Sequence, residues 1–115
     1  MSPFPPRKPR VAVAAVLIVL VCAASTSGPE APFLKDNRAA MDRMMAGMDI
    51  HPSGDVDADF AAIMIPHHQG AIDMAMAELR YGHNEQLRRI AQEIVVEQQQ
   101  EIAAMRLALP TTKGQ

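Results

Sequence analysis

Apolar residues recur every three or four positions through most of the chain beyond residue 30, a pattern typical of amphipathic α-helices. The pattern predicts three helices, which run from Phe33 to Met48, from Asp57 or Asp59 to Tyr81, and from an Asn84 cap to Leu109. The turn formers at 51–54 and Gly82 separate these helices, and no alternating run suggests a strand. Because the connections are short, neighbouring helices should be antiparallel. We therefore predict an all-α fold, a small antiparallel bundle with its core at 33–109.

The first 27 residues have the order of a secretory signal. Three basic residues at positions 7–10 precede an apolar run from Val11 to Val21, and small residues follow as far as Gly28. The run is shorter than the roughly 20 apolar residues that a membrane-spanning helix needs. We therefore predict a signal peptide at 1–27, with an uncleaved anchor as the alternative, and a helical domain at 28–115. Export to the periplasm or cell surface follows from this prediction.

Cys22 is the only cysteine and lies at the end of the apolar run. A lipoprotein signal is a second alternative, in which this thiol would carry the lipid. The preceding Val19-Leu20-Val21 fits poorly, because a small residue is expected directly before the cysteine. In either case the domain has to fold without an internal disulfide.

The predicted domain is acidic and poor in aromatic residues. Residues 31–115 hold eight lysines and arginines against twelve aspartates and glutamates, a net charge of −4. Nucleic-acid binding needs a basic patch and stacking rings, and the sequence provides neither. We therefore exclude nucleic acid as a partner and expect membrane contact only through the signal segment.

Polar residues interrupt the apolar stripes of the second and third helices where a simple bundle would have leucine or isoleucine. His67 and His68 interrupt one stripe, and Gln98 and Glu101 interrupt the other. If the two helices fold back about residue 83, His68 comes level with Gln98. The loop at 49–58 then returns the first helix to the same height. The candidate ligands in this layer are Met41, Met44, Met45, Met48, Met64, His67, His68, Gln98, Glu101 and Met105.

This donor set favours copper. Thioether sulfur suits Cu(I), and imidazole suits both oxidation states, so Cu(I) is favoured with Cu(II) as the alternative. Zinc would prefer a set that includes cysteine. A di-iron centre needs paired Glu-x-x-His motifs, and no histidine here has a glutamate three residues before it. Methionines at helical spacing also pack cores, so each methionine of the first helix has that simpler interpretation as well.

Other residues near the motif have more ordinary interpretations. Pro66 either bends the second helix around a core or fixes the orientation of the two histidines that follow it. His51 and His83 fall in predicted turns, where histidines are usually solvated. Glu78 is expected to pair with Arg88, which is nearly level with it across the turn.

The chain resembles the DUF305 family. The resemblance rests on Asp59-Phe60, on MIPHHQGAIDMA at 64–75, on AQEI at 91–94, and on Gln98, Glu101-Ile102 and Met105. It implies an exported, ferritin-like helical bundle, and some members of the family bind copper through methionine and histidine. On the matching positions of this sequence, the implied ligands are Met64, His67, His68 and Met105.

These observations lead to one leading hypothesis and one alternative. The leading hypothesis is an exported copper-binding protein that buffers or traffics Cu(I)/Cu(II) through methionine and histidine ligands. The alternative is a metal-free helical interaction or scaffold module of the cell envelope, whose polar layer only fixes register. An enzyme is not expected, since the sequence pairs no nucleophile with a base and contains no phosphate loop. The expected partners are copper ions and either a second copy of the chain or a copper-trafficking protein.

Overall fold

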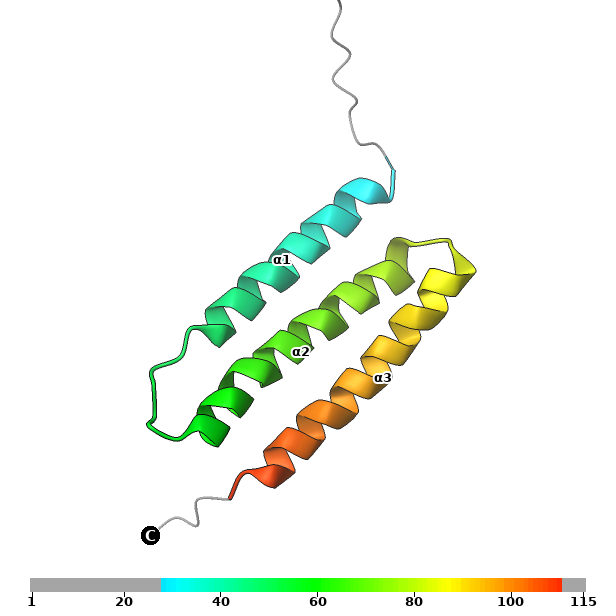
Figure 1. The fold of residues 1–115 in the computed structure, drawn as a ribbon. Helices are drawn as coiled ribbons and strands as arrows, with labels where there is room; N and C mark the ends of the chain where they lie inside the picture. The colour runs from blue at the N-terminus through cyan, green and yellow to red at the C-terminus, as the bar shows by residue number, and fades with distance from the viewer. Residues whose placement is uncertain (1–27, 111–115) are drawn as a thin grey trace, which may run out of the picture.

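The computed structural model describes residues 28–110, so the predicted signal segment at 1–27 lies outside the described residues. Three α-helices make up this part of the chain (Figure 1): α1 (Glu30–Met48), α2 (Val56–Tyr81) and α3 (Glu85–Ala108). Residues 28–110 contain no strand. The all-α prediction and the number of helices are therefore confirmed.

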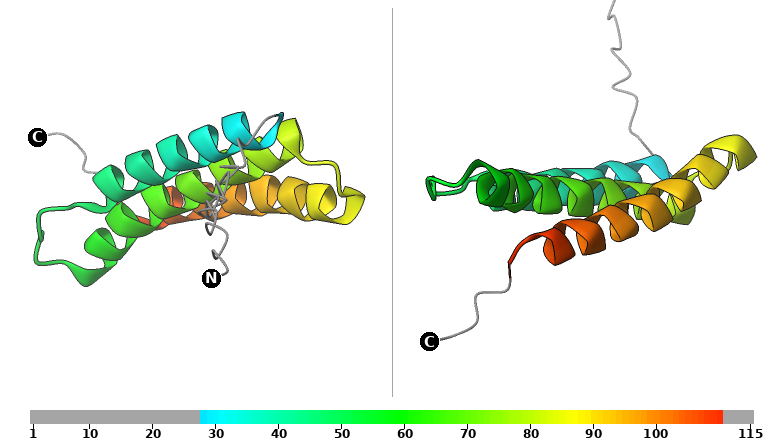
Figure 2. Two further views of the ribbon diagram at one scale, coloured as in Figure 1. Left: turned by 90° about the horizontal axis from the view of Figure 1, so that it is seen from above. Right: turned by 60° about the horizontal axis from the view of Figure 1, so that its bottom comes forward.

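The helices lie side by side with α2 in the middle, and each runs antiparallel to its neighbour in the chain (Figure 1). Both α1 and α3 pack against α2, but no Cα of α1 comes within 8 Å of a Cα of α3. Figure 2 shows that α3 is inclined to the other two helices. The molecule is thus a twisted single layer. Helix α2 is covered on two sides and has two further faces that no helix covers.

Helix α2 begins earlier than the sequence pattern predicted. Its N-cap is Asp55, whose carboxylate accepts hydrogen bonds from the backbone N–H groups of Asp57 (3.0 Å) and Ala58 (3.3 Å). Asp59, one of the two predicted caps, instead accepts from the N–H of Ser53 at 3.1 Å and so holds the preceding loop. Several acidic residues in succession can each cap a helix, and the one that follows the turn at Gly54 (φ +87°) takes the role.

The remaining helix ends are close to prediction. Asn84 caps α3 by accepting from the N–H of Leu87 at 3.0 Å, as expected, and α3 ends one residue before Leu109. Helix α1 starts at Glu30, directly after Pro29, rather than at Phe33. A proline at a helix start has its φ preset for the helix, and an acidic residue in the first turn favours the helix dipole. These local signals extend α1 beyond its apolar stripe.

Small residues allow α1 and α2 to approach closely. A Cβ added at Gly47 would lie 2.6 Å from the Cβ of Pro66, and one added at Gly70 would lie 2.9 Å from the Cβ of Met44. Pro66 lies inside the continuous helix α2 and packs toward α1 at this point. Its simpler role is therefore packing between helices. The interpretation that it also orients the histidines stays a prediction.

The buried core is made of small residues. Its apolar members are Ala40, Ala61, Ile72, Ala75, Ala77, Ala91 and Ile102. No large side chain in the described residues is fully buried, and several large apolar side chains are more than half exposed. No helix in residues 28–110 is long and apolar enough to cross a membrane.

Candidate metal centre

His68 is the only polar residue that the structure buries among residues 28–110, with 8% of its surface exposed. It lies on the side of α2 that faces α3, along with the buried Ala61, Ile72 and Ala75. Its Nε2 lies 2.5 Å from a carboxylate oxygen of Glu101 on α3. This contact joins two of the residues that the sequence placed in one polar layer.

The other ring nitrogen of His68, Nδ1, is buried and has no hydrogen-bond partner. A proton on Nε2 is donated to Glu101, so Nδ1 carries the free lone pair in that tautomer. A buried polar atom without a partner costs about 1–3 kcal/mol. Metal-binding histidines commonly donate one ring N–H to a carboxylate and bind the ion through the other nitrogen. The His68–Glu101 pair has this arrangement, and the unpartnered Nδ1 is the atom left to bind an ion.

Met64 and Met105 lie one helical turn from the pair. Met64 is four residues before His68 on α2, and Met105 is four residues after Glu101 on α3. Because the helices are antiparallel, these two steps of four residues lead in the same direction in space, so both methionines lie beyond the pair toward the same end of the helices. Both are half-buried. Two thioethers therefore lie on the same side of the imidazole and the carboxylate.

His67 is exposed, and its ring meets that of His68 edge to face with 5.9 Å between the ring centroids. The solvent-exposed ring of His67 thus lies next to the buried ring of His68. Gln98 is half-buried and lies three residues before Glu101 on α3. His68 contacts Glu101 and not Gln98, although α3 begins where the sequence predicted, after the Asn84 cap. The expectation that Gln98 lies level with His68 stays a prediction.

The methionines of α1 lie on the other side of α2 from the His68–Glu101 pair, because α1 and α3 flank α2. Met44 fills the space above Gly70 in the α1–α2 contact. Met41 and Met45 are exposed, at 50% and 61%, and Met48 is half-buried. Within one chain these four residues do not cover the pair. This arrangement differs from the layer expected for a closed bundle.

No group of three or more histidine, cysteine or carboxylate side chains that could hold an ion occurs within residues 28–110. The combination of a carboxylate-oriented imidazole with two thioethers one turn away would fit a soft ion such as Cu(I).

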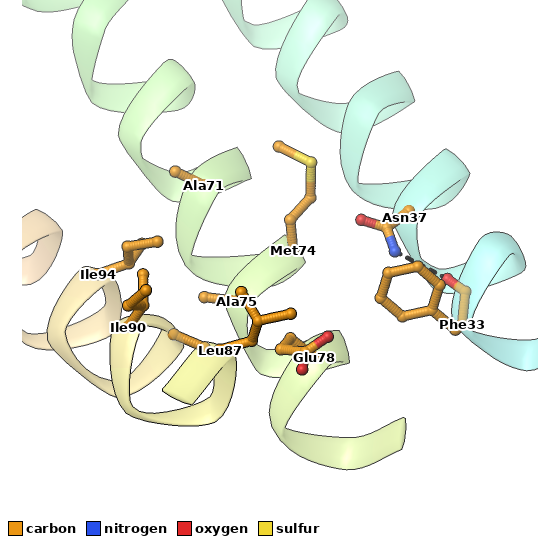
Figure 3. Close-up of a pocket in the computed structure, with 10 residues that line it drawn as sticks. Phe33, Asn37, Ala71, Met74, Ala75, Glu78, Leu87, Ile90 and Ile94 are labelled. Carbon is orange, nitrogen blue, oxygen red and sulfur yellow. Dashed lines mark hydrogen bonds between the residues drawn. The ribbon is translucent and has the colours of Figure 1, made fainter. Parts of the chain in front are cut away.

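The sequence did not predict an apolar groove that begins at Ala71, one turn beyond His67, and continues to Glu78 (Figure 3). Its volume is about 390 Å³. The lining comes from all three helices and comprises Phe33, Asn37, Ala71, Met74, Ala75, Glu78, Leu87, Ile90, Ala91 and Ile94. Arg88 does not pair with Glu78 as expected, because its guanidinium donates to the carbonyl oxygens of Leu79 (2.6 Å) and Gly82 (3.1 Å). In the sequence, the available signal for this groove was the apolar spacing of Leu87, Ile90 and Ile94 on α3.

A family model described as a domain of unknown function, DUF305, matches residues 21–109. The chain belongs to the DUF305 family. The match includes all three helices completely, and it contains every candidate ligand named above. A comparison with curated proteins found no match. Membership confirms the resemblance seen in the HHQGAIDMA region, while the description of the family assigns no activity.

Proposed function

We propose that this DUF305 protein binds copper, with Cu(I) preferred, and that it buffers or passes on the ion outside the cytoplasm. The observation that carries the proposal is the His68–Glu101 pair, in which a buried imidazole is held by a carboxylate and keeps a free Nδ1. Copper is the cargo of such a protein, and the chain supplies the ligands.

The ligands that we assign to the ion are His68 together with Met64 and Met105. Thioethers bind without losing a proton, so this donor set stays neutral and suits a soft monovalent ion. The negative charge of Glu101 lies on the far side of the imidazole, where it makes the ring a stronger donor. The carboxylate therefore positions His68 rather than binding the ion itself.

His67 has a separate role in the proposal. It is exposed, and its ring lies edge to face with that of His68. An ion captured by His67 from solvent has a short path to the buried ring. The exposed thioethers of Met41 and Met45 provide further weak capture positions on the same molecule. Exposed ligands also release the ion readily, as transfer to a partner requires.

The test is a competition titration of the purified protein with Cu(I) and a chromogenic Cu(I) chelator. Wild-type protein is expected to withdraw copper from the chelator. Replacing Met64 and Met105 together by leucine should weaken binding by about 100-fold or more, and Glu101→Gln by about 10- to 100-fold. Leucine preserves the apolar volume, so these losses report ligation and not folding.

Met76 provides the matched control. It lies on α2, 41% exposed, and lines a polar hollow with Arg43 and Arg80 away from His68. Met76→Leu should leave copper affinity unchanged. Wild-type protein that never competes with the chelator would overturn the proposal and favour the metal-free interaction module, which the exposed apolar groove supports.

A further inference from the structure

The two uncovered faces of the helical layer differ in chemistry. On one face, Arg43 pairs with Asp73 at 3.1 Å and Arg80 pairs with Asp36, so charged groups connect α1 and α2. The opposite face contains the apolar groove, in which Asn37 and Glu78 are the only polar residues (Figure 3). The layer as a whole is therefore amphipathic.

The apolar face extends beyond the groove along α2. Phe60 is eighteen residues before Glu78, which is five complete helical turns, so both residues lie on the same side of the helix. Met64, His67 and Ala71 continue this side from Phe60 into the groove. Phe60 is 57% exposed, which is unusual because a folded domain normally buries most of a phenylalanine side chain.

The outer helices add large apolar side chains to the same face. On α1, Met41 follows the groove residue Asn37 by four residues, and Met45 follows Met41 by four. On α3, the groove residues Leu87 and Ile90 are 53% and 43% exposed. A single layer leaves these side chains in water, and a stable domain normally buries such a face against a second layer.

The size of the face matches what a stable dimer buries. Helices of 24 to 26 residues are about 36–39 Å long, and three helices at ordinary spacing are about 25–30 Å wide. The face therefore measures about 900–1,200 Å², enough to provide the roughly 800 Å² that each partner contributes to a standard protein interface.

The face is also complementary to itself. Phe60 is exposed near one end of α2, and the groove around Met74 and Ala75 is hollowed toward the other end (Figure 3). A two-fold axis that lies between two stacked layers and runs across the helices puts each Phe60 over the partner's groove. The level midway between Phe60 and Met74 is that of His67, so the axis passes beside this residue. The antiparallel stacking also opposes the helix dipoles favourably.

We propose that a second copy of this chain covers the apolar face in this antiparallel arrangement, forming a two-layer bundle of six helices. The arrangement brings the two copies of His67 together at the axis, with Met64 and Met48 of each copy nearby. The second copy thus adds an imidazole and thioethers beside the copper site, a consequence that rests on the proposed function. The dimer covers His67, Met41 and Met45, so capture of an ion from solvent by these residues takes place on the single chain. The dimer itself does not require copper.

The test measures the mass of the metal-free protein by sedimentation equilibrium. The protein is expressed from its full-length sequence, and mass spectrometry identifies the N-terminus of the purified product. A dimer is expected. Phe60→Glu and Ile90→Glu should each weaken it by at least about 30-fold, the threshold for a central interface residue. Met76→Glu, on the polar face, should leave it unchanged. Helical circular dichroism of each variant establishes that the chain still folds.

Cysteine cross-linking tests the orientation. Mixing Phe60→Cys protein with Met74→Cys protein under mild oxidation should yield the mixed dimer in excess over either self-linked dimer. Predominant self-linking of Phe60→Cys would indicate parallel stacking and overturn the arrangement. A monomeric metal-free wild-type protein would overturn the proposal outright, as would an undiminished dimer in both glutamate variants. Failure of copper binding with the dimer intact would refute only the proposed function.

Discussion

Removing the carboxylate of Glu101 should destabilise the metal-free protein through its effect on His68. The Glu101→Ala variant leaves both ring nitrogens of a nearly buried imidazole without a protein partner. An unsatisfied buried polar group costs about 1–3 kcal/mol. The Glu101 side chain is 59% exposed, so water replaces part of the lost hydrogen bond, and the free energy of unfolding is expected to fall by about 1 kcal/mol.

Urea denaturation followed by circular dichroism measures this loss. For a domain of this size the free energy of unfolding falls by about 1 kcal/mol per molar urea, so the midpoint should drop by about 1 M. Protein concentration has to be equal in all samples, because association stabilises the folded state. Glu101→Gln retains an oxygen acceptor and should lose less than the alanine variant.

Glu93→Ala is the matched control. Glu93 is exposed on α3, two turns before Glu101, and points away from α2. Its removal should move the midpoint by no more than about 0.5 M, as for an ordinary surface substitution. Equal midpoints for the Glu101→Ala and Glu93→Ala variants would refute the argument that Glu101 holds a buried imidazole.

Three further predictions concern the fold. Asp55→Ala should lower the free energy of unfolding by about 1 kcal/mol, whereas Asp55→Asn retains the cap; equal losses in thermal or urea unfolding would contradict the capping role. Gly70→Ala should lose about 1 kcal/mol or more, because its Cβ meets Met44 and overpacking outweighs the gain in helix propensity. A double-mutant cycle with Met44→Ala should show that the two changes are coupled, and additive losses would count against the clash. Arg43→Ala removes the exposed Arg43–Asp73 ion pair and should lower the free energy of unfolding by less than about 1 kcal/mol at low salt and by almost nothing in 1 M salt. A large loss that does not depend on salt would contradict the interpretation of this contact as a surface ion pair.

The sequence was sufficient for most of the fold. Apolar periodicity and the caps at Asn84 and Gly82 located three antiparallel helices, because these signals are local. The caps at Asp55 and Pro29 were missed because several neighbouring residues have equal capping ability. The arrangement in a single layer was not predictable from periodicity. It depends on which sides of α2 the outer helices occupy, and small residues such as Gly47 and Gly70 decide that by allowing close approach.

The candidate site was predictable in part for the same reason. Glu101 was expected near the histidines, since two interrupted stripes on antiparallel helices have to match, and the contact with His68 agrees. The expectation that Gln98 lies level with His68 stays a prediction, because two side chains that lean along their helices can meet without their backbones being level. The methionines of α1 could not be positioned from the sequence, since an apolar stripe does not reveal whether a third helix closes a bundle or extends a layer.

X-ray absorption at the copper edge of the Cu(I)-loaded protein tests the central claim most directly, because it identifies the ligand atoms. The account predicts sulfur and imidazole nitrogen around each ion, with the sulfur signal reduced in the Met64→Leu/Met105→Leu double variant and retained in Met76→Leu. A copper environment of nitrogen and oxygen alone in the wild-type protein, or a sulfur signal unchanged in the double variant, would contradict the assignment of Met64, His68 and Met105 as the ligands.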